Sequence, residues 1–462
     1  MFPATPSRRE VLRAGALPLV GLGLPELLHA REAATGAKQL GKSKACIVLF
    51  MWGGPAHQDT WDLKPDAPRE YRGDFESIPT TVPGYRVCEH LPLLSRRTDK
   101  LAILRSVTHT DVNHVTAPHW MLTGRPSPRP EGAPRNEDWP NYGAILAKLG
   151  RGKGPLPPYV SMMPIVPNGA PRFVESTHGQ DGGWLGPLYH PMRIDADASK
   201  PDYRVGEFEL RAEVPATRAD ERKALLAQLD RQKRMMDAQL EPQAAKTHYQ
   251  RAFDLLSTPQ VTKAFDVSQE PMPLRERYGM NIHGQSVLQA RRLIEAGVPL
   301  VTVFWPNDGI TNVSVYWDTH SRNFIDLKER LCPVTDRAFS ALLDDLETRG
   351  MLDETLILWT GEMGRTPRVG QSVVGGAGAG KDGRDHWPHC FTSIFAGGGV
   401  KRGVVYGTSD RYAAFPATNP VSPTDLAATV YHCLGVDPHM LIRDRLGRPM
   451  ALCEGEPIGA IL

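Results

Sequence analysis

Long apolar runs and an excess of either charge are both missing from this chain of 462 residues. Beyond the first thirty residues, no segment approaches the roughly 20 consecutive apolar residues that a membrane-spanning helix needs. Lysine and arginine (54) nearly balance aspartate and glutamate (52), and no basic stripe with interleaved aromatic residues is present. A protein that follows a phosphate backbone needs such a stripe. We therefore expect no membrane span in the mature chain and no nucleic-acid partner.

Cysteine is scarce, and its spacing argues against one class of metal site. No two of the six cysteines are close enough to form a CxxC pair; they are Cys46, Cys88, Cys332, Cys390, Cys433 and Cys453. Three of them lie within apolar runs, where a buried thiol is the ordinary outcome. We predict no cysteine-based metal site.

The first thirty residues carry the pattern of an export signal. Arg8 and Arg9 precede a mildly apolar run from Ala14 to Leu28, which is followed by the small residue Ala30. These features describe a signal peptide over residues 1–30, and the arginine pair indicates the twin-arginine route, which moves folded proteins. The alternative is a membrane anchor, although the run is shorter than a membrane span. We expect a periplasmic or secreted protein whose mature part is residues 31–462.

Five apolar runs of strand length predict the core, at Ala45–Met51, Leu101–Leu104, Leu300–Trp305, Thr355–Trp359 and Cys390–Phe395. Their continuous apolar character is typical of parallel strands covered on both faces. Helical patterns at Ser286–Ala296 and Pro333–Arg349 lie between them. This order predicts an α/β fold with a doubly wound, mostly parallel sheet sandwiched by helices. The Arg, Lys, Glu, Gln, Leu and Met content of about 212–265 predicts a helical insertion.

Polar side chains follow the first two predicted strands. His57 and Asp59 come after Gly53 and Gly54, whose lack of a side chain permits a tight turn. An alternative for Asp59 is a turn or helix cap. Three histidines follow the second strand within eleven positions, at His109, His114 and His119. So many imidazoles are hard to explain as core residues, because each buried ring needs a hydrogen-bond partner.

Three further groups lie near the later strands. Asp318 and His320 share one side of an extended segment by alternation. Glu362 and Arg365 follow the strand at Thr355, and Arg384 and His386 come after a glycine-rich loop over 370–383. Open α/β sheets build their sites at the carboxyl ends of the strands. We therefore expect Asp59, His114, Asp318, His320, Glu362 and His386 to converge there. His57 is a further candidate ligand. Carboxylates mixed with imidazoles favour Zn or Mn over Ca.

At these residues the sequence resembles a family of exported bacterial proteins known as domain of unknown function 1501, within the alkaline phosphatase and sulfatase superfamily. The resemblance covers nearly the whole mature chain. It rests on Gly53-Gly54-Pro55 with Asp59 and Asp62, on Thr123-Gly124, on Trp317-Asp318-Thr319-His320, on Gly361-Glu362 with Gly364-Arg365-Thr366-Pro367, and on Gly383-Arg384-Asp385-His386-Trp387.

The resemblance implies an alkaline phosphatase-like fold, a pair of metal ions, and transfer of a phosphoryl or sulfuryl group to water. Asp318 and His320 resemble one ligand pair, and His386 resembles a later ligand. Glu362 stands in the place of the aspartate of an Asp-His pair, whose histidine is replaced by Met363. His114 occupies the position of the hydroxyl nucleophile. The chain therefore departs from the pattern at the nucleophile and at the second metal site.

Two functions follow as hypotheses. The first is an exported hydrolase of phosphate or sulfate esters that uses one or two divalent ions, acting on a small molecule or a polysaccharide. In this hypothesis His114 acts at the reacting centre, and Arg365 or Arg384 binds the anionic group. The second is a non-catalytic binding or scaffold protein outside the cytoplasm that retains the fold.

Overall fold

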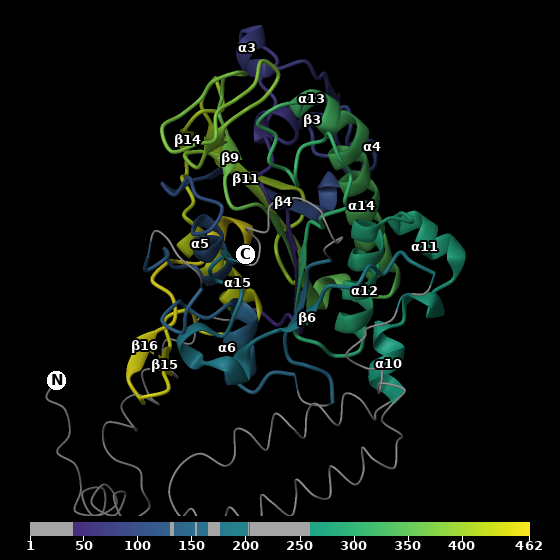
Figure 1. Cartoon of the computed structure of the whole chain (residues 1–462), viewed down its shortest axis with the longest axis vertical. Helices are drawn as coiled ribbons and strands as arrows, with labels where there is room; N and C mark the ends of the chain where they lie inside the picture. The colour runs from purple at the N-terminus through teal and green to yellow at the C-terminus, as the bar shows by residue number, and fades with distance from the viewer. Residues whose placement is uncertain (1–39, 130–133, 153–154, 165–175, 202, 204–258) are drawn as a thin grey trace, which may run out of the picture. The chain divides into compact units, whose positions relative to one another are not determined.

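An eight-stranded sheet forms the centre of the fold, and all five apolar runs contribute a strand to it (Figure 1). The computed structural model describes residues 40–129, 134–152, 155–164, 176–201, 203 and 259–462. The predicted signal peptide at 1–30 and most of the predicted insertion at 212–265 lie outside these residues. Across the sheet the strands are β12 (Val404–Tyr406), β4 (Leu101–Val107), β11 (Phe391–Gly397), β8 (Thr355–Thr360), β1 (Ala45–Phe50), β7 (Leu300–Phe304), β5 (Val160–Met162) and β6 (Met192–Ile194).

The sheet is mostly parallel, as predicted. Every neighbouring pair is parallel except the two that β11 makes, with β4 and with β8. The central strand β1 pairs Cys46 with Leu300 of β7 and with Leu356 of β8. Because β11 is reversed, its first residue lies at the edge where the parallel strands end. Residues that precede β11 in the sequence therefore reach that edge.

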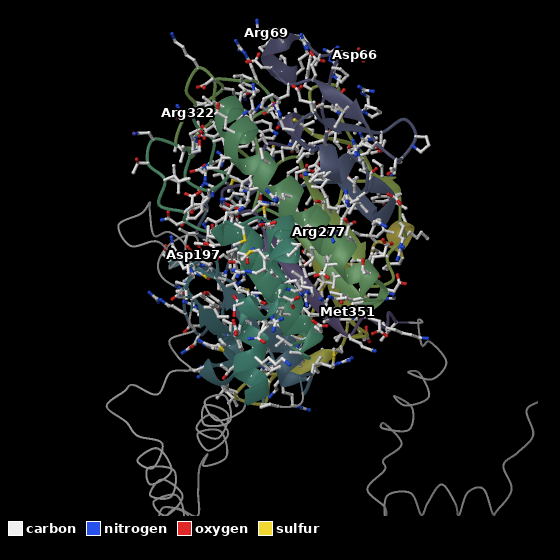
Figure 2. The ribbon with its side chains drawn as sticks, turned by 90° about the vertical axis from the view of Figure 1, so that its right-hand side faces the viewer. Asp66, Arg69, Asp197, Arg277, Arg322 and Met351 are labelled. Atoms are coloured by element: carbon white, nitrogen blue, oxygen red, sulfur yellow. The ribbon has the colours of Figure 1, made fainter. Side chains whose placement is uncertain are left out.

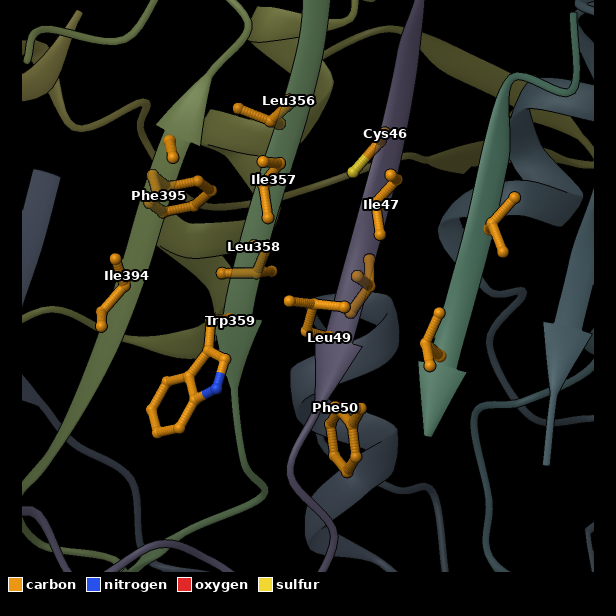
Figure 3. Close-up of a cluster of buried hydrophobic side chains, with 14 of the residues drawn as sticks. Cys46, Ile47, Leu49, Phe50, Leu356, Ile357, Leu358, Trp359, Ile394 and Phe395 are labelled. Carbon is orange, nitrogen blue, oxygen red and sulfur yellow. The ribbon is translucent and has the colours of Figure 1, made fainter. Parts of the chain in front are cut away.

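The core is built on the central strands, whose side chains are buried on both faces of the sheet. β1 and β8 are buried along their whole length. Figure 3 shows side chains of β1, β8 and β11 packed side by side, including Ile47, Leu358 and Phe395. Burial of apolar surface at about 25 cal/mol per Å² is the main term that stabilises such a core. This packed core holds the ends of the central strands in fixed positions.

Helices cover both faces of the sheet (Figure 1). The α-helices of the described residues are α3 (Arg69–Arg72), α4 (Pro92–Ser95), α5 (Ala117–Thr123), α6 (Tyr142–Lys148), α10 (Pro259–Phe265), α11 (Met272–Tyr278), α12 (Ile282–Glu295), α13 (Asn323–Asp326), α14 (Cys332–Thr348) and α15 (Pro423–Cys433). On one face α12 packs on β7, β1 and α14, while α6 and the pair α5 and α15 lie on the other. The two predicted helices correspond to α12 and α14.

Local signals in the sequence set the ends of the long helices. The Asn281 side chain accepts the Gly284 N–H at the start of α12, and Ser422 forms a capping box with Asp425 at the start of α15.

Arg277 of α11, labelled in Figure 2, makes an ion pair of 3.2 Å with Asp344 of α14. Within the described ranges, no helix is both long and apolar enough to cross a membrane.

Short antiparallel ribbons lie outside the main sheet, and one of them contains two of the candidate site residues. The ribbons are β2 (Ser77–Pro79) with β3 (Arg86–Cys88), β9 (Gly364–Arg365) with β10 (His386–Trp387), β13 (Thr408–Ser409) with β14 (Pro416–Thr418), and β15 (Leu441–Arg443) with β16 (Pro449–Ala451). In the β9–β10 ribbon, His386 pairs with Arg365. The ribbon connects the segment after β8 to the segment before β11 at the carboxyl edge of the parallel strands.

Candidate metal centre

Four side chains from distant parts of the chain meet at the carboxyl edge. His114, Asp318, His320 and His386 each offer one donor atom, and these atoms all lie within 4.8 Å of one another. Asp318 is central: its Oδ1 lies 3.2 Å from Nε2 of His114, 2.9 Å from Nε2 of His320 and 3.6 Å from Nε2 of His386. Four of the six residues expected to converge are therefore brought together.

The three imidazoles are held by their other ring nitrogens. His320 Nδ1 lies 2.6 Å from the Gly378 carbonyl oxygen, and His386 Nδ1 lies 2.8 Å from that of Val112. Because a carbonyl only accepts, both Nδ1 atoms carry the proton. His114 Nδ1 lies 2.5 Å from Glu362 Oε1. Such contacts fix the orientation of metal-binding histidines in proteins.

With the tautomers fixed in this way, positive charge between the His320 and His386 rings would stabilise the cluster. With Nδ1 protonated, a neutral His320 and a neutral His386 present lone pairs on Nε2, and these two atoms are only 2.9 Å apart. Two lone pairs at this distance repel one another unless a proton or a metal cation lies between them. The Asp318 oxygen beside them adds negative charge. The arrangement is therefore stabilised by a bound cation, either a proton or a metal ion.

Glu362 is the fifth expected residue that reaches this region, and its carboxylate contacts His114 of the cluster. It is fully buried, and its Oε1 also accepts the Gly53 N–H at 2.8 Å. Burial lowers the pKa of His114, but the Asp318 and Glu362 carboxylates outweigh it and raise that pKa to about 9. Glu362 thus orients His114 and adds negative charge behind it.

Arg365 supports the cluster from its buried side. It is fully buried, its Nε donates to the Gly54 carbonyl at 3.0 Å, and its Nη2 contacts the Gly53 carbonyl and Asp318 Oδ1. Burial raises the pKa of Asp318, but Arg365 and His114 outweigh it and hold that pKa well below its usual range. Asp318 is therefore a carboxylate, as a metal ligand must be.

His57, Asp59 and Arg384 lie outside the cluster, each engaged by other groups. Arg384 donates from Nε to Asp59 Oδ2 at 2.7 Å and from Nη2 to Oδ1 at 2.9 Å, in a bidentate pair buried on both sides. Asn323 also donates to Asp59. His57 Nε2 donates to the Ala413 carbonyl at 2.9 Å. Asp59 and Arg384 occupy one another inside the fold, and this geometry supports a structural role for them in place of the expected ligand and anion-binding roles. His57, also expected as a ligand, lies outside the cluster, with Nε2 bound to a backbone carbonyl.

The histidines at His109, His114 and His119 were expected to be hard to explain as core residues, but His109 and His119 are buried and each has hydrogen-bond partners within the fold. The sequence pattern assigned no role to Asp385 or to the backbone carbonyls that hold the cluster imidazoles. His109 donates from Nε2 to the Glu362 carbonyl at 2.7 Å and accepts the Asp111 N–H on Nδ1. His119 donates to the Arg125 carbonyl and accepts the Trp139 N–H. The carboxylate of Asp385, beside His386, accepts hydrogen bonds from three backbone N–H groups. In the sequence, the one sign that Asp385 belongs to the site is its position next to His386, a predicted ligand. The carbonyls of Val112 and Gly378 could not be predicted, because a backbone group has no signature in the sequence.

One protein family matches most of the chain. Its profile, described as "Protein of unknown function (DUF1501)", matches residues 43–462. A search of curated proteins returned no match. Among solved structures, the chain is similar to a sulfatase from Pseudoalteromonas sp., with 16% identity, a TM-score of 0.38, and coverage of 94% of this chain and 73% of that one.

Two further solved structures are similar in the same range. A phosphonate monoester hydrolase from Silicibacter pomeroyi has 12% identity and a TM-score of 0.40, with 90% of this chain and 76% of that one covered. The C-terminal periplasmic domain of EcEptC from Escherichia coli, in complex with Zn, has 9% identity and a TM-score of 0.34, with 86% of this chain and 83% of that one covered.

Proposed function

Since this chain belongs to the DUF1501 family, a family of unknown function, its activity has to be inferred from its own side chains, and we propose that it is a metal-dependent hydrolase of phosphate or sulfate esters. The observation that carries the proposal is the 2.9 Å approach of two imidazole Nε2 atoms whose Nδ1 atoms are both proton donors. The resemblance to the alkaline phosphatase and sulfatase superfamily supplies the reaction class. A small-molecule or polysaccharide ester is the proposed substrate.

The donor set fits one zinc ion. Three imidazoles and one carboxylate are typical zinc ligands, at about 2.0 to 2.2 Å from the ion, which places tetrahedral donors about 3.4 Å from one another. Asp318 Oδ1 lies 2.9 to 3.6 Å from the three Nε2 atoms. In the described part of the chain this is the one group of ligand-type side chains with such spacing. We therefore propose one ion, with Mn as the alternative metal.

The residues around the donors have separable roles in the proposed reaction. A divalent ion supplies Lewis acidity toward an ester oxygen and makes water more acidic. The side chains of His114, His320, His386 and Asp318 would hold it, and the Asp318 carboxylate would balance part of its charge. His114 serves as a ligand in this proposal, replacing its sequence-based role at the reacting centre. Glu362 holds its Nδ1 at 2.5 Å, and metal binding would require its Nε2, which lies 3.2 Å from Asp318 Oδ1, to release its proton. The cluster contains no hydroxyl group, so we propose that water attacks the ester directly.

One observation favours the alternative of a non-catalytic metal-binding or scaffold protein. Both arginines that were expected to bind the anionic group are fully buried and occupied, Arg384 by Asp59 and Arg365 by Asp318 and the Gly53–Gly54 turn. The charge of the ion would then be the main attraction for a phosphate or sulfate group. The two functions differ in turnover and agree in metal binding.

Metal titration combined with an ester panel tests the proposal. We expect the purified chain to bind one zinc ion, and its melting temperature to rise with zinc, because an ion that binds only the folded state adds about 2.7 kcal/mol at 100 times its Kd. The double variant Asp318→Ala with His386→Ala should lose both effects. We expect turnover of at least one ester among aryl phosphates, phosphodiesters and aryl sulfates.

A matched control uses the same residue types on the surface. Asp353 and His439 have side chains 79% and 40% exposed, and the variant Asp353→Ala with His439→Ala should bind zinc as the unaltered chain does. Equal zinc binding by both double variants would overturn the metal site. Zinc binding without turnover of any ester would favour the scaffold function.

The proposed location is outside the cytoplasm, by the twin-arginine route. It rests on Arg8 and Arg9 and the apolar run that follows them. Exchange of both arginines for lysine should leave the precursor in the cytoplasmic fraction, and normal export of that variant would contradict the route.

A further inference from the structure

Asp385 is a buried carboxylate around which the glycine-rich loop is wound. Its side chain is fully buried. Oδ2 accepts the N–H groups of Val373 at 2.9 Å and Gly378 at 3.2 Å, and Oδ1 accepts that of His386 at 2.8 Å. Three backbone donors around one carboxylate form charge-assisted hydrogen bonds, which are stronger than neutral ones.

The backbone of Asp385 is fixed independently of the loop. Its N–H donates to the Thr366 hydroxyl at 3.0 Å, and its carbonyl accepts the Thr366 N–H at 2.8 Å. Thr366 follows β9, whose ribbon with β10 is anchored on the strand ends. The carboxylate is therefore a fixed point, and the loop segment from Val373 to Gly378 takes its position from it.

That loop segment in turn holds a cluster imidazole. The Gly378 residue whose N–H binds Asp385 also presents its carbonyl to His320 Nδ1 at 2.6 Å. Asp385 Oδ1 lies 3.4 Å from the same nitrogen, so the shorter contact to the carbonyl sets the tautomer. The loop touches the carboxylate closely, since the Cβ of any side chain on Gly376 would clash with both carboxylate oxygens of Asp385.

From these contacts we infer that Asp385 is a positioning residue for the metal centre, which aims His320 Nε2 at Asp318 through the backbone of Gly378. This inference rests on the proposed function, since it concerns the same site. It gives the glycine-rich loop a defined role, because the loop N–H groups bind Asp385 and the Gly378 carbonyl binds His320. The glycine at 376 leaves room for the carboxylate.

Two variants disturb this arrangement from opposite sides without removing a ligand. Asp385→Asn keeps the size of the side chain but puts an NH₂ group where oxygens accept N–H groups. Gly376→Ala leaves the carboxylate intact and pushes the loop away from it. Asp382→Asn is the matched control, since Asp382 belongs to the same loop and accepts from Arg322 N–H. Metal-ligand orienting partners typically contribute 10- to 100-fold in metal affinity, so we expect zinc to bind about 10- to 100-fold more weakly in both test variants and unchanged in the control.

The visible spectrum of the cobalt(II)-substituted chain separates positioning from general destabilisation, because it reports the ligands and geometry at the metal. We expect the spectra of Asp385→Asn and Gly376→Ala to shift toward that of His320→Ala, while Asp382→Asn keeps the original spectrum. An unchanged spectrum and zinc affinity in Gly376→Ala would overturn the inference even if Asp385→Asn failed to fold. Absence of zinc binding by the unaltered chain would instead overturn the proposed function.

Discussion

At the scale of single residues, two aspartates paired with buried arginines occupy contrasting environments. Asp318 contacts Arg365, and its side chain is 18% exposed beside three imidazoles. Asp59 is fully buried against Arg384, and Asn323 also donates to it. A carboxylate with every neighbour a protein donor is a structural group, whereas one that faces imidazole lone pairs can accept a cation. Environment, and not residue type, separates the two.

We predict that Asp59→Ala destabilises the fold without removing the metal site. Arg384 would remain buried with its charge unpaired, which typically costs about 3–5 kcal/mol. The double variant Asp59→Leu with Arg384→Met should recover part of that loss, because it removes both charges. Denaturant unfolding gives the free energy, and zinc titration of the folded protein should still give one ion per chain. Loss of zinc binding with unchanged stability would mean that Asp59 is a ligand after all.

At the scale of elements, the turn after β1 brings the cluster together. Gly53 has φ of +100°, its N–H binds Glu362, and a Cβ there would clash with the Asp318 backbone nitrogen. Gly54 has φ of +79°. The turn therefore needs glycine both for its backbone angles and for the close approach of the Asp318 segment. A substitution at Gly53 should therefore displace Asp318, one of the proposed metal ligands.

We predict that Gly53→Ala weakens zinc binding as well as the fold. Gly297 is a matched control, because its φ is +102° and nothing lies within 4 Å of a Cβ built on it. Gly297→Ala should therefore show only the strain of a left-handed alanine, about 1–2 kcal/mol, with normal zinc affinity. Gly53→Ala should be about 1–3 kcal/mol less stable than that control, since steric overpacking is added. Equal stability and equal zinc affinity in the two variants would show that the contact with Asp318 is unimportant.

The sequence predicted the main strands of the sheet but not all of the elements that form the site. Apolar runs of strand length identified the five main strands, and the segments of Asp318, His320 and Glu362 do follow strands of the sheet. The reversed direction of β11 could not be read from its composition, because a buried strand is apolar whichever way it runs. His386 reaches the edge only because of that reversal. The strands β5, β6 and β12 have three residues each, too few for a recognisable pattern.

Within the site, the sequence could not predict which groups bind one another. Asp59 and Arg384 are far apart in sequence, and their pairing depends on how the loops pack. The same holds for the carbonyls of Val112 and Gly378, which bind His386 and His320. A motif shows which chemical groups are available. Which of them face one another is decided by backbone geometry over separations of 58 to 325 residues.

At the scale of the whole molecule, one chain-wide property follows from histidines that the cluster does not use. His283 of α12 is 2% exposed and packs on the Trp305 ring, with a centroid distance of 4.4 Å. Burial lowers the pKa of His283 to about 3. Burial likewise lowers the pKa of His57 to about 4, although Asp62 opposes it. Both rings are therefore neutral in the folded chain at a pH where the unfolded chain is already protonated.

The sign of the effect on stability follows from proton binding. Between the ordinary histidine pKa of 6.5 and about 3, the unfolded chain binds a proton at residue 283 and the folded chain does not. Acid therefore favours unfolding, and stability falls as pH drops through this window by up to about 1.4 kcal/mol per pH unit for each such histidine. Below the folded pKa the loss from that residue levels off. His57 contributes in the same direction, over a window that closes at about 4.

We predict that His283→Phe makes the fold less sensitive to acid. Phenylalanine keeps an aromatic ring against Trp305 but takes up no proton, so the free energy of unfolding should fall less between pH of about 6 and about 4, by up to about 1.4 kcal/mol per unit. His439→Gln changes an exposed histidine, whose side chain is 40% exposed, and should leave the slope as it is. Denaturant unfolding with a chelator present measures the slope apart from metal binding. If both variants gave the slope of the unaltered chain, His283 would have to be protonated in the folded state, and its packing against Trp305 would need an acceptor for that proton.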